Sequence, residues 1–68
     1  MNINRFWVLL SDDKTWYFAL EVEGFECVIR VEDAFQCHRK KDAEAMAEYA
    51  NSLDSSVHWS VKEIKESR

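Results

Sequence analysis

KKDAEAMAEYANSL, which runs from Lys40 to Leu53, is the stretch that decides the fold class. Its apolar side chains recur at helical spacing, and charged and amide side chains fill the positions between them, which is the pattern of an amphipathic helix. At 1.5 Å per residue this helix is about 20 Å long. Its apolar positions are Ala43, Met46, Ala47, Ala50 and Leu53.

Beyond the helix the pattern changes from helical to alternating. Residues 51–56 are mostly polar and read as the end of the helix and a short connection. Val57, Trp59 and Val61 then alternate with polar residues, which predicts a last strand that ends in a charged tail.

Before the helix, the single glycine of the chain, Gly24, separates two β-rich runs. A two-residue type II′ turn prefers glycine at its first central position, which predicts a hairpin with Gly24 and Phe25 in the loop. The register that follows places one continuous apolar face across both strands. Its pairs are Glu23 with Glu26, Val22 with Cys27, Leu20 with Ile29 and Phe18 with Val31.

The first strand is expected over residues 6–10, joined to residues 16–20 through the turn residues 11–14. A three-residue loop directs Val8 to the core, whereas a two-residue loop reverses the parity and buries Trp7 and Leu9 instead. We prefer the three-residue loop because it leaves polar side chains on the outer face. It pairs Leu10 with Trp16 and Val8 with Phe18, buries Phe6, Val8 and Leu10, and leaves Arg5 and Ser11 outside.

These elements predict an α+β domain spanning residues 1–68, in the order β-β-β-α-β. The helix packs on one face of an antiparallel-rich four-stranded sheet, and no repeat, proline or low-complexity linker divides the chain. The expected core comprises the helix alanines with Met46 and the residues Phe6, Val8, Leu10, Phe18, Leu20, Val22, Cys27, Ile29, Val31, Trp59 and Val61.

The composition narrows the function classes. The 68 residues are 47% hydrophobic, which is enough for one core that folds without a cofactor. A formal net charge of −4 disfavours nucleic acid and membrane surfaces as general partners, because both attract basic proteins. No signal peptide is visible, and no stretch approaches the roughly 20 apolar residues that span a bilayer. We therefore expect a cytoplasmic protein.

The sequence contains no pattern typical of an enzyme or a metal site. An extended run would hold Cys27 and Cys37 roughly 30 Å apart, which argues against a shared disulfide or metal. Cys27 and His58 could meet at the starts of their strands, but a zinc site needs about four ligands. The adjacency of Cys37 and His38 does not make their side chains converge as a thiolate–imidazole pair requires. We expect no catalysis, metal or cofactor.

Cations cluster where the helix begins, although a helix N-terminus favours acids or small polar caps. Such a cluster can grip phosphate or a carboxylate surface, or it can remain a solvated loop whose long side chains bend away from the helix. Its members are His38, Arg39, Lys40 and Lys41.

A second candidate surface is the outer face of the sheet, where the preferred register places Trp7, Tyr17 and Arg30 among aliphatic and charged neighbours. Aromatic residues are enriched in protein interfaces, although a solvated face with ordinary cross-strand packing accounts for the same pattern. The acids of the chain form a third candidate, a mimic of nucleic-acid phosphates. They are Glu21, Glu23, Glu26, Glu32, Asp33, Asp42, Glu44 and Glu48.

Two aromatic-rich hairpin strands, a third strand, the helix spacing Ala43-x-x-x-Ala47-x-x-x-Asn51 and the closing strand Val57-His58-Trp59-Ser60-Val61 resemble small bacteriophage-encoded α+β proteins. The resemblance covers most of the chain. Proteins of this type include anti-CRISPR and other anti-defence inhibitors. It implies a stoichiometric inhibitor that occupies a nucleic-acid-binding or assembly surface of a host complex in the host cytosol, and it assigns no binding residue.

The leading hypothesis is therefore a non-enzymatic inhibitor of a host defence or nucleic-acid-processing protein. Two alternatives stay open. One is a homodimeric accessory module that associates through the face of Trp7 and Tyr17. The other is a nucleic-acid-binding module that uses residues 38–41.

Overall fold

A computed structural model describes residues 3–53 and 56–67 of the chain. It confirms the α+β class and the order β-β-β-α-β, with a short 3₁₀ helix, η1, added before the α-helix. The elements are β1 (Ile3–Ser11), β2 (Tyr17–Glu21), β3 (Gly24–Val28), η1 (Val31–Asp33), α1 (Lys40–Leu53) and β4 (Trp59–Ser67).

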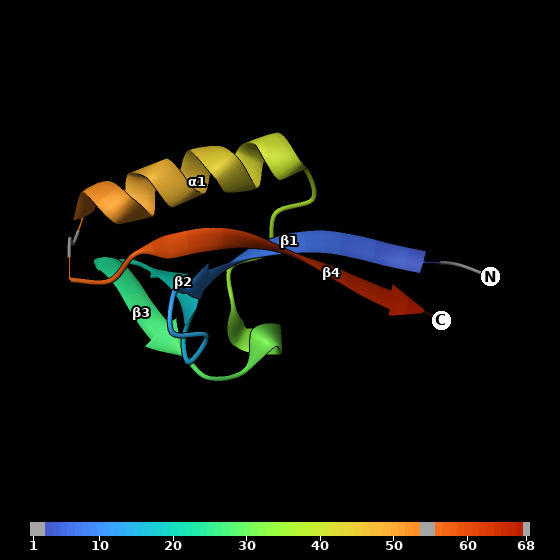
Figure 1. Ribbon diagram of the computed structural model, residues 1–68, viewed down its shortest axis with the longest axis horizontal. Coiled ribbons are helices and arrows are strands. Elements are labelled where there is room, and N and C mark those ends of the chain that lie inside the picture. Colours follow the sequence, from blue (N-terminus) through green and yellow to red (C-terminus); the bar gives the residue numbers. More distant parts are fainter. Residues whose placement is uncertain (1–2, 54–55, 68) are drawn as a thin grey trace.

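The strands form one antiparallel sheet in the order β3-β2-β1-β4, and α1 lies across one side of it (Figure 1). β4 is longer than the sequence suggests, because the charged tail continues the strand and pairs with the start of β1. The pairing runs from Ser11 opposite Trp59 to Ile3 opposite Ser67. Beyond the N-terminal end of α1, β1 and β4 continue as a two-stranded arm (Figure 1).

The register of the first hairpin is the one that a two-residue loop would give, so the preferred parity is wrong. Leu10 pairs with Tyr17, which puts Leu9 on the helix side of the sheet. The reason lies in Ser11, which is buried rather than exposed. Its hydroxyl donates to the carboxylate of Asp13 over 2.6 Å and accepts the backbone N–H of Trp16 over 3.1 Å, so its burial leaves no polar group unsatisfied.

The second hairpin also turns two residues earlier than expected. Glu21 pairs with Gly24, so Val22 and Glu23 form the loop and Gly24 begins β3. Gly24 has a φ of +141°, a backbone conformation that residues other than glycine rarely adopt. In this register the ring of Phe25 stacks on Phe18 at a centroid distance of 5.3 Å, a contact that is lost if Phe25 lies in the loop.

This shift overturns part of the predicted core. Leu20 and Ile29 are 45% and 70% exposed, Val22 is fully exposed, and β3 ends before Ile29. The predicted burial of Phe6, Val8, Phe18, Trp59 and the alanines Ala43 and Ala50 is confirmed. Leu10, Cys27, Val31, Met46, Ala47 and Val61 are half-buried.

Both faces of the sheet carry a core cluster. On the helix side Leu9, Phe18, Ala50 and Trp59 are buried together. On the other side Phe6, Val8 and Ala34 are buried, with Val31 of η1 packed against them. The segment after β3 therefore covers the face that lacks a helix. This explains why β1 directs apolar side chains to both faces of the sheet.

The same segment also fills a gap inside the sheet. The backbone N–H of Phe35 donates to the carbonyl of Phe18 on β2 over 2.9 Å, and Cys37 exchanges two backbone hydrogen bonds of 2.8 Å with Trp7 on β1. Residues 35–37 therefore lie between β1 and β2. They form hydrogen bonds with backbone groups of Trp7 and Phe18 that the two strands do not pair with each other.

The end of α1 is fixed to the start of β4 by Asn51. Its side-chain amide donates to the carbonyl of Trp59 over 3.1 Å and accepts the Trp59 N–H over 2.7 Å. The Trp59 ring is buried, and its Nε1 has no hydrogen-bond partner among the described residues. Within residues 3–53 and 56–67, no helix is long and apolar enough to cross a membrane.

Candidate functional site

The predicted basic cluster stands at the start of α1, and all of its side chains are exposed. The backbone carbonyl of Arg39 accepts the N–H of Ala43 over 3.2 Å, so the cluster straddles the first helical turn. Asp42 supplies the acid of that turn. Within the described part of the chain, none of the four cluster residues forms an ion pair shorter than 4.0 Å.

The predicted aromatic face does not form, because Trp7 and Tyr17 lie on opposite sides of the sheet. Trp7 has the parity of Leu9 on the helix side, whereas Tyr17 packs against the cluster on the other side. Both rings are half-buried. Arg30 lies beyond β3, where its guanidinium contacts Glu32 at 2.6 Å. That contact raises the pKa of Arg30 and lowers the pKa of Glu32.

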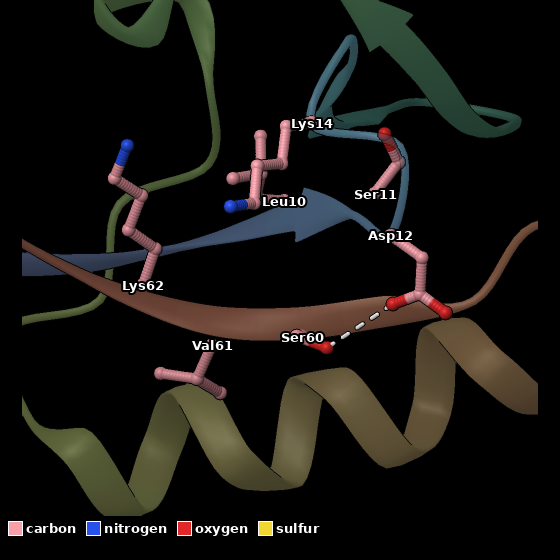
Figure 2. A pocket seen from close by; sticks show the side chains of 7 residues that line it. All are labelled: Leu10, Ser11, Asp12, Lys14, Ser60, Val61 and Lys62. Carbon is pink, nitrogen blue, oxygen red and sulfur yellow. Dashed lines mark hydrogen bonds between the residues drawn. The ribbon is translucent and has the colours of Figure 1, made fainter.

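An open groove of about 440 Å³, which no sequence pattern indicated, lies beside the end of β1 and the start of β4. Figure 2 shows the side chains of Lys14 and Lys62 on the same side of the sheet as Leu10, while Val61 points toward α1. Lys14 has a φ of +63°, in the left-handed region, where the β-carbon of a residue other than glycine lies too close to the backbone. The groove is lined by Leu10, Ser11, Asp12, Lys14, Ser60, Val61 and Lys62.

A serine, a histidine and an aspartate meet at the rim of this groove but do not form a catalytic triad. His58 Nδ1 lies 3.1 Å from Asp12 Oδ1, and the Ser60 hydroxyl donates to the same oxygen over 3.4 Å. In a triad the histidine must lie between the carboxylate and the nucleophile. Here both groups contact the carboxylate, so no base stands beside the hydroxyl.

Cys27 and Cys37 are not joined in a disulfide. Cys37 is buried, and desolvation with a smaller effect of Asp42 raises the pKa of its thiol, which disfavours a nucleophilic thiolate. The expected approach of Cys27 to His58 is wrong, because β3 and β4 are the two opposite edges of the sheet. Within the described ranges no three His, Cys, Asp or Glu residues come together as metal ligands.

Exposed apolar side chains gather at the β2–β3 end of the helix side. Exposed Leu20 and half-buried Phe25 are cross-strand partners there, and fully exposed Val22 lies in the loop with Glu23. Tyr49 and Leu53, which are 51% and 44% exposed, lie on the flank of α1 opposite the side chain of Asn51. Because Asn51 faces β4, that flank faces the β2–β3 half of the sheet. We call Leu20, Val22, Phe25, Tyr49 and Leu53 the hairpin patch.

Three glutamates lie at the β2–β3 hairpin, and the register directs Glu21 and Glu26 to the face of the sheet opposite the helix. Glu21 and Glu23 flank Val22, and Glu26 lies on β3. Glu21 and Glu26 share a hydrogen bond, and this bond together with their mutual repulsion raises the pKa of Glu26. The signal for this patch was present in the sequence as Glu21-Val22-Glu23, an apolar residue between two acids, but the shifted turn concealed its exposure.

A scan of protein-family models finds no match to the chain. A search of curated proteins and a search of solved structures likewise find no significantly similar protein. We therefore base the proposed function on the geometry of the described residues.

Proposed function

We propose that the chain acts by binding another protein through the hairpin patch. The observation that carries this proposal is the exposure of Leu20 and Val22 on the β2–β3 hairpin and of Tyr49 and Leu53 on the flank of α1 that faces the β2–β3 half of the sheet. Large apolar side chains exposed together on a small domain are typical of interfaces, and the tyrosine adds the residue type that interfaces favour.

The charges around the patch favour a basic partner surface. Glu23 lies beside Val22 in the loop, Glu21 and Glu26 lie on the other face of the same hairpin, and the whole chain carries a net charge of −4. Complementary charge steers association and suppresses wrong partners. A basic surface that otherwise holds nucleic acid meets this requirement.

The sharper proposal is an inhibitor that occupies such a surface on a host defence or nucleic-acid-processing protein. The resemblance to small phage proteins suggests this role, and the acidic hairpin supports it because glutamates can take the place of phosphates. We assign no catalytic step to the groove or to the basic cluster.

The test compares two exposed apolar positions. Val22 lies in the patch, whereas exposed Ile29 follows the opposite end of β3. A tagged wild-type chain, Val22→Arg and Ile29→Arg are used to capture partners from bacterial lysate, and the affinity of each purified partner is measured by calorimetry. We expect Val22→Arg to weaken binding at least about tenfold, and Ile29→Arg to leave it unchanged.

The inhibitor role is tested on the same partner with its own oligonucleotide substrate. We expect one equivalent of the chain to displace the oligonucleotide, and Val22→Arg to displace none at that concentration. A partner that binds both variants equally contradicts the assignment of the patch. A partner that binds the chain and its oligonucleotide together contradicts the inhibitor role.

A further inference from the structure

β4 is an edge strand whose outer side is almost uncovered. The strand order places it at one end of the sheet, with β1 as its partner. The side chain of Asn51 occupies the outer side only at Trp59, the first residue of the strand. From Val61 onward, no described element pairs with this edge, and long uncovered edges are templates for further strands.

The hydrogen bonds at the start of the strand fix which backbone groups face outward. Asp12 donates to the carbonyl of His58, in the same register as the β1–β4 pairs. Even-numbered residues of β4 therefore direct their N–H and C=O groups to β1, because these directions alternate along a strand. Trp59 bonds outward to Asn51, as this alternation requires. The outward groups that follow belong to Val61, Glu63 and Lys65.

The side chains of this stretch have a particular symmetry of charge. Residues 62–66 read Lys-Glu-Ile-Lys-Glu, with Ile64 at the centre. Reversing the direction of the segment places a glutamate where each lysine stood and a lysine where each glutamate stood. An antiparallel copy is thus the charge complement of the segment itself.

We propose that β4 pairs antiparallel with β4 of a second copy of the chain, in the register that places Ile64 opposite Ile64. Lys62 then faces Glu66 and Glu63 faces Lys65, each twice because the contact is two-fold symmetric. The outward backbone groups of Glu63 exchange two hydrogen bonds with those of Lys65 in the other copy. The two sheets become one, and this contact is independent of the hairpin patch.

Neighbouring registers are disfavoured by the same charges. Moving the two-fold axis by one residue places Glu63 opposite Glu63 or Lys65 opposite Lys65. The favoured axis passes through Ile64 of β4, and the C-terminal part of β4 extends beyond α1 (Figure 1). Ile64 itself packs against the cluster of Phe6, Val8 and Ala34, so the centre of the contact rests on a buried support.

The test measures self-association by sedimentation equilibrium in about 0.15 M salt, with the wild type, Lys62→Glu, Glu66→Lys and the double swap Lys62→Glu/Glu66→Lys. Each single variant places like charges opposite each other twice, so we expect the dimer dissociation constant to rise about tenfold or more. Glu66→Lys reduces the net charge of −4, so general repulsion predicts a tighter dimer for it, whereas the proposed pairing predicts a weaker one. The double swap restores opposite charges and wild-type affinity.

A backbone variant tests the pairing without relying on charge. Lys65→Pro removes an N–H that faces away from β1, so we expect an unchanged circular dichroism spectrum and loss of the dimer. The proposal is overturned if the wild type stays monomeric up to about 1 mM. A dissociation constant of that size corresponds to a binding free energy of only about 4 kcal/mol. A dimer that Glu66→Lys strengthens, or that Lys65→Pro leaves intact, also overturns it.

Discussion

The two edge strands of the sheet differ in length, charge and surroundings. β3 has five residues, and its Glu26 is held close to Glu21, a like charge on the neighbouring strand. β4 has nine residues, and its lysines and glutamates alternate so that a reversed copy complements them. The difference teaches that one small sheet can present two kinds of surface. We propose that the acidic β3 end binds a basic partner surface and that the β4 edge binds a second copy of the chain.

The largest expected effect comes from breaking the support of the β3 end. Phe18 is fully buried and touches the rings of Phe25 and Trp59, at centroid distances of 5.3 and 5.5 Å. Phe18→Ala should lower the free energy of unfolding by about 3–5 kcal/mol, because it leaves a cavity under the hairpin. Urea denaturation measures the change. Leu20→Ala on the same strand is the control and should cost less than about 1 kcal/mol, and equal costs would contradict the assigned register.

The next effect is expected where α1 covers the start of the β4 edge. Asn51→Ala removes two hydrogen bonds to Trp59 and should lower the free energy of unfolding by about 1–3 kcal/mol, since the Trp59 backbone groups lose their partner. Asn51→Asp keeps an acceptor for the Trp59 N–H and should cost less. Thermal unfolding distinguishes the two variants, and a harmless Asn51→Ala would show that this contact does not hold the edge.

A smaller effect of opposite sign is expected in the turn that connects β1 to β2. Lys14 has a φ of +63°, and glycine adopts this conformation without steric cost. Lys14→Gly should therefore raise the free energy of unfolding by about 0.5–1 kcal/mol. Lys14→Ala keeps the β-carbon and should give no such gain in urea denaturation. A gain of equal size from alanine would assign the effect to the charge rather than to the backbone.

The smallest effect concerns the like charges at the β3 end. The pKa of Glu26 is raised by Glu21, so ionised Glu26 destabilises the folded state, and this penalty disappears as the pH falls through the raised pKa. Glu26→Gln should make the chain slightly more stable than the wild type at pH 7. At a pH below the usual carboxyl pKa range, the variant and the wild type should be equally stable. Unfolding curves at both pH values measure the difference. A difference that persists in acid would exclude repulsion as its cause.

The element types followed from periodicity, because the apolar spacing of α1 and the alternation around Trp59 are local properties of the sequence. The hairpin registers did not follow, because both depend on contacts that are distant in sequence or hidden in a turn. Ser11 is buried through bonds to Asp13 and Trp16, and Phe25 is drawn from the expected loop to the ring of Phe18. A buried serine and a shifted glycine leave no periodic signal.

The candidate surfaces depended on those registers and changed with them. Trp7 and Tyr17 separated to opposite faces once Leu10 paired with Tyr17 rather than Trp16. The exposure of the basic residues 38–41 survived, because it depends only on where α1 begins. The charge symmetry of residues 62–66 was visible in the sequence, but its meaning required the knowledge that β4 is an edge.

Amide hydrogen exchange of the wild type at low and high protein concentration tests the contrast between the two edges most directly. In β4, the amides of Lys62 and Ile64 bond to β1, whereas those of Glu63 and Lys65 face outward. We predict that exchange at Glu63 and Lys65 slows as the concentration rises, while the outward amides of β3 do not change. Slowing at β3, or at neither edge, would contradict the account.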